Sequence, residues 1–322
     1  GAGIYIDSSQ YISISKNSFE RNYQYHEGGA MYINNCNHIF ITNNNIEDNG
    51  ENSDFGGGIQ TRWSENIYIV GNLITNNKAG AGAGLFFEDS QVQLVNNTIC
   101  SNESESFGGG ILCRNSDAII QNNIIYSNTA RTDGDQMYLN ISSTSSIYFS
   151  NIEGGLEAIG LEGSSFDGIY ENNLDSDPLL TNSGTHPYQI EINSPCMNTG
   201  NPDTTGLFIP EFDLVGNERI SQNRIDMGAY EYYFPSDIHE QLEASKILIY
   251  PNPAHDNITI WTPQNEIEKP TFSIYDIKGS SVFKKQINTS KQMLDVSFLP
   301  KGIYIIEITN SKIVKSDKLI LY

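Results

Sequence analysis

The stretch GGGILCRNSDAIIQNNIIYSN, residues 108–128, decides the fold, because most of the chain before it repeats the same pattern. In each copy a Gly-containing run leads into a short apolar strand, and these runs begin at residues 1, 28, 56, 82, 108 and 134. Successive copies therefore start 27, 28, 26, 26 and 26 residues apart. A period of this size predicts a solenoid, in which each repeat buries its apolar face by stacking on its neighbours.

The apolar residues of each copy are mostly Ile, and they alternate with polar residues as in β-strands. A leucine-rich repeat would instead need an L-x-x-L-x-L-x-x-N frame. Since the repeat lacks that frame, we interpret each copy as three short strands. We therefore expect an all-β fold, a parallel β-helix. Alternation assigns the inward positions of the first and third strands to Ile4, Met31, Ile59, Leu85, Ile111, Met137, Phe19, Ile46, Ile74, Ile99 and Ile125.

Pairs of asparagines five residues apart recur in five copies of the repeat. The first member of each pair shares the inward parity of the third strand, and these residues are Asn17, Asn44, Asn72, Asn97 and Asn123. We predict that they stack as a structural ladder, each amide bonding the next rung and satisfying backbone groups at a corner. The alternative interpretation is that the asparagines only form turns in loops.

The charge of the chain is unevenly distributed. The net charge is −21, but residues 246–322 hold ten Lys and seven acids, whereas residues 1–245 hold 8 basic and 32 acidic residues. This shift predicts a domain boundary and argues against nucleic acid as a partner, because a phosphate backbone needs a basic surface. No run of 18 apolar residues is present, so we expect no transmembrane segment.

The four cysteines form no CxxC motif and no cluster with histidine, so we expect small buried side chains and no disulfide framework. Parity places Cys113 inward and Cys100 outward. Gly1 already lies in register with the repeat, and from this we expect a fragment or mature form of a longer secreted protein.

The period fades after residue 155, and residues 156–232 are expected to form a terminal cap of a β-helix unit spanning 1–232. Its strings DPLL, SPCMNTG and DLVGNERISQNRIDMGAYE resemble the closing segment of bacterial right-handed β-helix proteins of the pectate-lyase-like superfamily. The resemblance implies a right-handed solenoid and carries no activity. Asp203, Asp213 and Asp226 could alternatively bind calcium, although they lack a D-x-D-x-D-G frame. No other cofactor is expected.

Residues 233–245 are predicted to be a linker, and residues 246–322 a small antiparallel β-sandwich. Its motifs closely resemble the type A carboxy-terminal sorting domain of type IX secretion substrates in Bacteroidetes. The residues that carry the resemblance include Tyr250, Pro251, Asn252, Pro253, Gly279, Gly302 and Tyr304. The resemblance implies docking on the type IX secretion machinery and a secreted or outer-membrane cell-surface location.

The outward face of the first strand holds the candidate ligand-binding residues, which are Arg62, Trp63, Phe86, Glu88 and Arg114. Aromatic rings beside Arg suit sugar rings and uronate carboxylates, so an acidic polysaccharide is a candidate partner. Two Arg flanking one Glu are expected to leave a surplus positive charge. Rows of like residues also stabilise any β-helix by cross-strand contact, which is the alternative interpretation.

Two classes of function stay open. The five histidines are scattered, and we find no nucleophile and base pair, so no catalytic residue is assigned. The chain is predicted to bind glycans or surfaces without catalysis. The alternative is a polysaccharide lyase or glycoside hydrolase of the β-helix type, with its catalytic centre on the helix flank or in a missing amino-terminal region.

Overall fold

A computed structural model describes residues 2–23, 27–51, 53–140, 142–163, 165–181, 183–184, 186–220, 224–232, 248–261, 271–287, 289, 291–309 and 314–321. The chain divides into two compact units, Gly1–Tyr233 and Phe234–Tyr322. The stretch expected to be a linker, residues 233–245, lies outside the described residues. In the described part of the chain, no helix is long and apolar enough to span a membrane.

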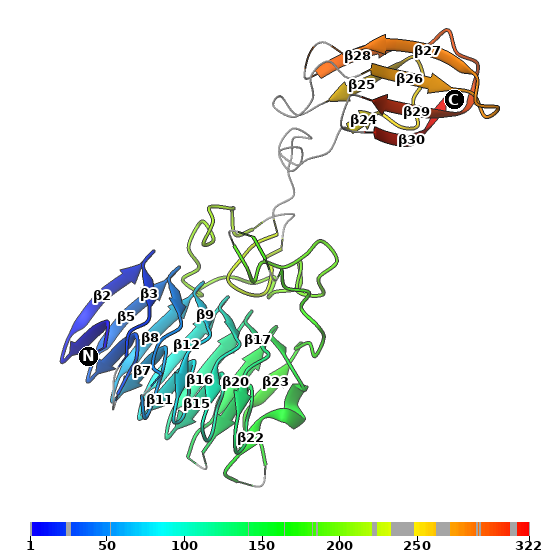
Figure 1. The fold of residues 1–322 in the computed structure, drawn as a ribbon. Coiled ribbons are helices and arrows are strands. Elements are labelled where there is room, and N and C mark those ends of the chain that lie inside the picture. The colour runs from blue at the N-terminus through cyan, green and yellow to red at the C-terminus, as the bar shows by residue number, and fades with distance from the viewer. Residues whose placement is uncertain are drawn as a thin grey trace. The chain divides into compact units, whose positions relative to one another are not determined.

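The amino-terminal unit is a parallel β-helix whose strands stack rung upon rung (Figure 1). The first sheet contains β1 (Ile4–Asp7), β4 (Met31–Asn34), β7 (Ile59–Arg62), β11 (Leu85–Glu88), β15 (Ile111–Arg114), β19 (Met137–Leu139) and β22 (Gly160–Leu161). The second contains β2 (Gln10–Ser15), β5 (Asn37–Thr42), β8 (Glu65–Val70), β12 (Gln91–Val95), β16 (Asp117–Gln121), β20 (Ser145–Tyr148) and β23 (Ile169–Glu171). The all-β solenoid expected from the repeat is confirmed.

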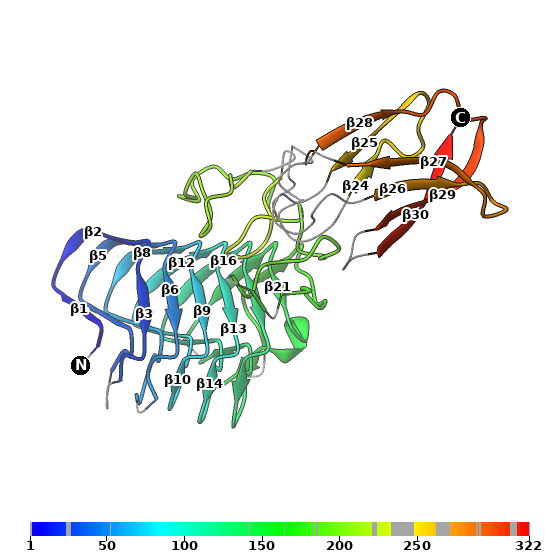
Figure 2. The ribbon, with the colours of Figure 1, turned by 45° about the horizontal axis from the view of Figure 1, so that its top comes forward.

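The third sheet completes each rung, and Figure 2 shows it beside a short fourth one. It contains β3 (Ser18–Glu20), β6 (Asn45–Glu47), β9 (Leu73–Thr75), β13 (Thr98–Cys100), β17 (Ile124–Tyr126) and β21 (Asn151–Ile152). The fourth contains β10 (Lys78–Ala79), β14 (Glu103–Ser104) and β18 (Thr129–Ala130). A 3₁₀ helix, η1 (Gly155–Ala158), follows β21, and β22 and β23 add part of a further turn beyond residue 155.

Equivalent residues of successive copies are direct neighbours across the rungs. Leu85, for example, pairs with Ile59 on one side and Ile111 on the other, and all three are fully buried. One continuous core of inward Ile, Leu, Met and Phe side chains therefore runs through the solenoid. No single rung could enclose this core, because each contributes only a few apolar side chains.

Side-chain ladders satisfy the backbone where the chain turns between sheets. Asn97 is fully buried, and its Oδ1 accepts hydrogen bonds from the backbone N–H of Asn72 at 2.9 Å and from the Asn72 amide at 3.0 Å. Its own amide donates to the carbonyl oxygen of Ile69 and to Oδ1 of Asn123. The same bonding runs along the predicted ladder residues Asn17, Asn44, Asn72, Asn97 and Asn123.

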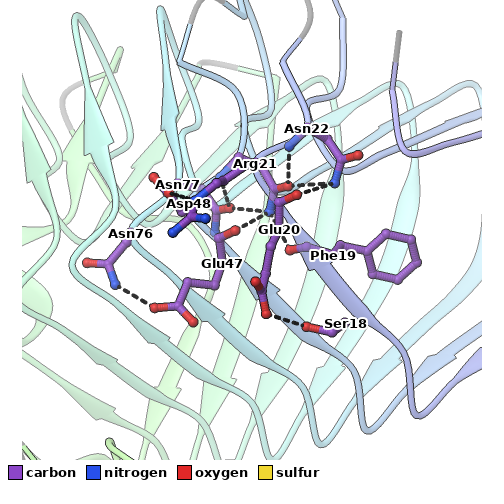
Figure 3. Close-up of polar contacts among 10 residues, drawn as sticks. Ser18, Phe19, Glu20, Arg21, Asn22, Glu47, Asp48, Asn76 and Asn77 are labelled. Atoms are coloured by element: carbon purple, nitrogen blue, oxygen red, sulfur yellow. Dashed lines mark hydrogen bonds and ion pairs between the residues drawn. The ribbon is translucent and has the colours of Figure 1, made fainter.

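Two more ladders follow the other corners. The second member of each asparagine pair stacks after the third sheet, from Asn22 through Asn49 and Asn77 (Figure 3) to Asn102 and Asn128. A serine ladder lies between the first and second sheets, where backbone N–H groups donate to the hydroxyls of Ser64, Ser90, Ser116 and Ser143. A left-handed residue precedes each position of the two asparagine ladders, such as Asn96 (φ 52°) before Asn97.

The segment after β23 covers the corner between the second and third sheets. Arg219 is buried there and donates to the carbonyl oxygens of Gly228 at 3.0 Å and Ala229 at 2.8 Å. A Cβ at Gly71 would lie 2.8 Å from the Arg219 guanidinium, so this corner accepts only glycine. The arginine of the closing motif therefore cross-links the cap internally where the cap packs against Gly71, and bonds such as that from the Asn96 amide to the carbonyl oxygen of Asp226 join the cap to the solenoid.

The three acids considered for calcium do not form a common site. The Asp213 carboxylate accepts the backbone N–H groups of Val215, Asn217 and Glu231, and that of Asp226 accepts those of Asn198 and Tyr232. Burial raises the pKa of Asp226 to about 6. Asp203 is exposed and accepts the N–H of Thr205. Among the described residues, no group of three His, Cys, Asp or Glu could hold a metal ion.

All four cysteines are buried and free. Cys113 lies in the solenoid core, whereas Cys100 points outward and is covered by the cap, where it packs in one cluster with Cys196 and Met227. Burial raises the pKa of Cys113 and of Cys196 to about 12, so both stay protonated thiols at neutral pH.

The carboxy-terminal unit is antiparallel. One sheet contains β24 (Leu248–Tyr250), β25 (Asn257–Trp261) and β28 (Lys291–Asp295), and the other contains β27 (Ser281–Gln286), β26 (Thr271–Tyr275), β29 (Gly302–Thr309) and β30 (Val314–Leu321). Its core is a separate cluster that includes Ile258, Phe272 and Leu319.

Several residues that carry the resemblance to the sorting domain make structural contacts within this unit. Asn252 accepts the backbone N–H of Ile320 through Oδ1 at 3.0 Å and donates its amide to the carbonyl oxygen of Lys318. The Tyr304 hydroxyl donates to the carbonyl oxygen of Pro300 at 2.6 Å, and Gly279 (φ 84°) closes the turn between β26 and β27. Pro251 and Pro253 follow cis peptide bonds on either side of Asn252.

Replacing Asn97 by alanine is expected to lower the free energy of unfolding by about 1 to 3 kcal/mol, because the buried amide and N–H of Asn72 and the carbonyl of Ile69 lose their partner. Thermal and urea unfolding of the β-helix unit measure the change. The exposed Asn193→Ala is the matched control, and equal unfolding of the two variants would contradict the structural role of the ladder.

Candidate functional site

The three charged residues predicted on the first sheet are neighbours on successive strands. Glu88 of β11 pairs in register with Arg62 of β7 and with Arg114 of β15. Oε2 of Glu88 lies 2.9 Å from Nε of Arg62, and Oε1 lies 3.4 Å from a terminal nitrogen of Arg114. The repeat alone brings these side chains together.

A fourth charge changes the balance of this group. Glu27, from the loop after the third strand of the first repeat, lies 3.5 Å from the Arg62 guanidinium. Burial and a hydrogen bond with Glu27 raise the pKa of Tyr32 to about 12, so Tyr32 is a neutral member of the network. Arg62 and Arg114 thus face two carboxylates, those of Glu27 and Glu88. The prediction of a surplus positive charge is wrong, because Glu27 supplies the second negative charge.

Phe86 faces outward from the first sheet, as its parity predicts, but its side chain is fully buried. The Phe55 ring stacks on it at 5.0 Å, and the Arg114 guanidinium lies 5.0 Å from its centroid. The loops that follow the third sheet therefore fold back over this row of the first sheet. The ring face of Phe86 is not open to a ligand, which corrects the expectation that it supplies an aromatic surface.

Trp63 is the exposed aromatic residue of the predicted group, with 53% of its surface accessible. It directly follows β7 and occupies the left-handed corner position (φ 48°), which points its side chain away from the core. The Arg62 guanidinium lies 4.1 Å from the centroid of the ring. A cation held against an indole fixes the orientation of the ring while the remaining surface stays open to solvent.

A groove of about 520 Å³ lies along the corner between the first and second sheets. Its lining comes from four successive rungs and consists of Ser8, Ser9, Gln10, Asn35, Cys36, Asn37, Trp63, Glu65 and Asp89. Ser8, Asn35, Trp63 and Asp89 occupy the same left-handed corner position in their repeats. The lining therefore combines one aromatic surface with amides, hydroxyls and two carboxylates, which suits stacking and hydrogen bonding with a sugar.

The second side of the groove depends on a feature that the sequence prediction missed. The strands β2, β5 and β8 each contain one extra residue, Tyr11, His38 and Asn66, which is skipped by the register and has a φ of 54° to 59°. These stacked bulges directly follow the lining residues Gln10, Asn37 and Glu65. Bulges of this kind re-aim side chains and occur next to functional sites.

A signal for the bulges is present in the sequence. The first apolar residues of the first and second strands are eight residues apart in the first three copies, as from Ile4 to Ile12, but seven apart in the next two, as from Leu85 to Val92. Three of the four rungs that line the groove therefore carry the extra residue.

Comparison with known families assigns both units. Residues 1–107 match the family described as right handed beta helix region, and residues 248–322 match the secretion system C-terminal sorting domain. The right-handed β-helix and the type IX sorting domain implied by the sequence motifs are confirmed. The sorting domain indicates secretion or a location at the outer-membrane surface.

Two curated proteins share shorter segments with the chain. One is an endo-acting ulvan lyase of Formosa agariphila, 32% identical over 79 residues, and the other a funoran endo-beta-hydrolase of Wenyingzhuangia aestuarii, 28% identical over 80 residues. Each match covers 24% of this chain but only 15% and 11% of the respective relative. Segments of this length cannot cover the β-helix unit of residues 1–233.

We expect Arg62→Ala to lower the free energy of unfolding by about 1 kcal/mol, because it removes two partly buried ion pairs and the contact with Trp63. Urea unfolding at low and high salt measures the effect, which should shrink as salt increases. Arg21→Ala is the matched control, since its pair with Asp48 is exposed (Figure 3) and should contribute nothing measurable. Equal stability of the two variants would show that the Arg62 network is only a surface feature.

Proposed function

We propose that this protein, a type IX secretion substrate built on a right-handed β-helix, binds polysaccharides at its corner groove without catalysing their cleavage. Export places the solenoid outside the cell, where polysaccharides of cell walls and matrices are the abundant polymers. The long flank of a solenoid suits such ligands, because equivalent positions repeat along its axis.

The exposed Trp63 at the edge of the groove carries the proposal. An indole half open to solvent and braced by Arg62 at 4.1 Å presents an apolar ring face in a fixed orientation at the groove. The left-handed backbone of Trp63 recurs at the equivalent corner residues Ser8, Asn35 and Asp89, so the aromatic side chain is what distinguishes this rung. Stacking of an apolar sugar face on this ring is the interaction that the groove supports best.

The alternative is a polysaccharide lyase or glycoside hydrolase. The two curated relatives favour it, since their names describe a lyase and a hydrolase that act on the polysaccharides ulvan and funoran. The groove lining offers two carboxylates, Glu65 and Asp89, but no Lys, Arg or His that could act as a base for lyase chemistry. A catalytic centre elsewhere on the flank or in a region outside this sequence would be needed for the lyase alternative.

Trp63→Ala is expected to reduce binding to the recognised polysaccharide at least about tenfold, the scale of one lost aromatic contact in a binding site. Affinity electrophoresis through gels containing neutral and acidic polymers, ulvan and funoran among them, measures the change. Phe208→Ala is the matched control, because Phe208 is 52% exposed and also has a positive φ of 53° but does not line the groove. Equal loss in both variants, or none in either, would contradict the proposed site.

The same panel separates binding from catalysis. Incubation of each polymer with the protein should release neither new reducing ends nor unsaturated sugar ends, the products of a hydrolase and a lyase respectively. Release of either product by the wild-type protein would establish the enzymatic alternative.

Deleting residues 246–322 is expected to leave the β-helix unit folded but to prevent its export, because that unit has its own continuous core and the sorting domain is a separate compact unit. Cell fractionation in a host with the secretion system should find the truncated protein in the periplasm. Its appearance in the medium or at the cell surface would contradict the role of the domain.

A further inference from the structure

We infer that the groove selects an uncharged polysaccharide, bound with its chain parallel to the solenoid axis, and excludes uronate polymers. This inference rests on the proposed function, because it names the class of glycan that the same groove would take. It differs from the initial expectation of an acidic ligand, which was based on a surplus of arginine.

The charges at the groove are the first part of the argument. Its lining contains the carboxylates of Glu65 and Asp89 and no cationic side chain. Glu65 is exposed, so its charge faces the solvent-filled groove. Asp89 accepts a hydrogen bond from the Asn115 amide, a neutral partner that leaves its negative charge in place. A uronate chain bound in the groove would bring one carboxylate per sugar close to Glu65 and Asp89. Carboxylates of like charge repel each other.

The nearby arginines do not offset this repulsion. Arg62 lies within 3.5 Å of both Glu27 and Glu88, and Arg114 within 3.4 Å of Glu88. Both guanidinium groups are therefore neutralised in place by carboxylates of the protein itself. Residues 1–245 hold 32 acids against 8 basic residues, so the field around the groove is also negative and repels anionic polymers before contact.

The shape of the groove gives the direction of the chain. The corner residues Ser8, Asn35, Trp63 and Asp89 line it on four successive rungs, and adjacent rungs are spaced by about 4.8 Å, so the groove extends for about 14 Å along the axis. The stacked bulges at Tyr11 and His38 run in the same direction, with their rings 4.9 Å apart. The corner residues form one row along the axis and the bulge residues form the other. A polymer crossing the axis would run into both rows, whereas a polymer parallel to the axis lies between them.

The uncharged lining residues fit a ligand rich in hydroxyl groups. Gln10 and Asn35 are exposed amides that can both donate and accept hydrogen bonds, as sugar hydroxyls do. Trp63 supplies the stacking surface. Together these groups bind a neutral sugar without requiring a charge on it.

The experiment compares polymers that differ only in charge. Each polymer bound by the wild-type protein is titrated by calorimetry beside its carboxymethylated form if it is neutral, or beside its carboxyl-reduced form if it is acidic. The uncharged member of each pair is expected to bind at least about tenfold more tightly at low salt, and the difference should decrease as salt is added.

A charge-neutralised variant tests whether the groove itself makes this selection. Glu65→Gln with Asp89→Asn keeps the size of both side chains, and Asn is well suited to the left-handed position of residue 89. This double variant should reduce the preference for the neutral polymer, measured as the ratio of the two affinities, by at least about threefold relative to wild type. Glu157→Gln with Asp167→Asn removes the same charge from exposed positions outside the groove, and should change neither affinity.

The outcomes are distinguishable. If the wild-type protein binds the acidic member of a pair as tightly as the neutral one, or if the two double variants behave alike, the selection of uncharged glycans is overturned while polysaccharide binding stands. If no polymer of either kind binds, the proposed function fails and this inference fails with it.

Discussion

The side-chain ladders at the corners are the interaction on which the rest of the protein depends. A chain that turns several times in every rung exposes backbone N–H groups that no neighbouring strand can accept, and burying them unpaired would be costly. Asn97 and its equivalents accept these groups from inside, while Ser64 and its equivalents do so at another corner. Because each ladder residue bonds its counterpart in the next rung, the register of the whole solenoid is fixed, and outward side chains align along the axis.

The proposed binding groove lies where the chain departs from this regularity. The bulges at Tyr11, His38 and Asn66 interrupt the register of the second sheet on three rungs only, and the groove lies beside them. The loops after the third sheet likewise bring Phe55 over Phe86 and Glu27 beside Arg62. The regular repeat thus supplies a rigid support. The bulges and the loop residues Glu27 and Phe55 determine which parts of its surface are open to solvent and what charge those parts carry.

Periodicity explains what could be predicted from the sequence. The inward positions, the alignment of Arg62, Glu88 and Arg114, and the outward parity of Cys100 all follow from counting residues between copies, because parallel rungs translate sequence spacing directly into contact. The burial of Phe86 and the partner of Arg62 could not be obtained in this way. Both depend on Glu27 and Phe55, which lie outside the strands of the repeat and are positioned by tertiary packing.

The contact of Asn252 with β30 has a consequence for protein synthesis. The first segment of the sorting domain binds the backbone of Lys318 and Ile320, nearly seventy residues later in the chain. Translation must therefore pass residue 320 before Asn252 can form these two hydrogen bonds. A chain that is released early by the ribosome, or shortened by a protease at that end, retains Asn252 but lacks the backbone groups of Lys318 and Ile320 that Asn252 binds. Closure of the sorting domain therefore requires that the chain is present as far as Ile320.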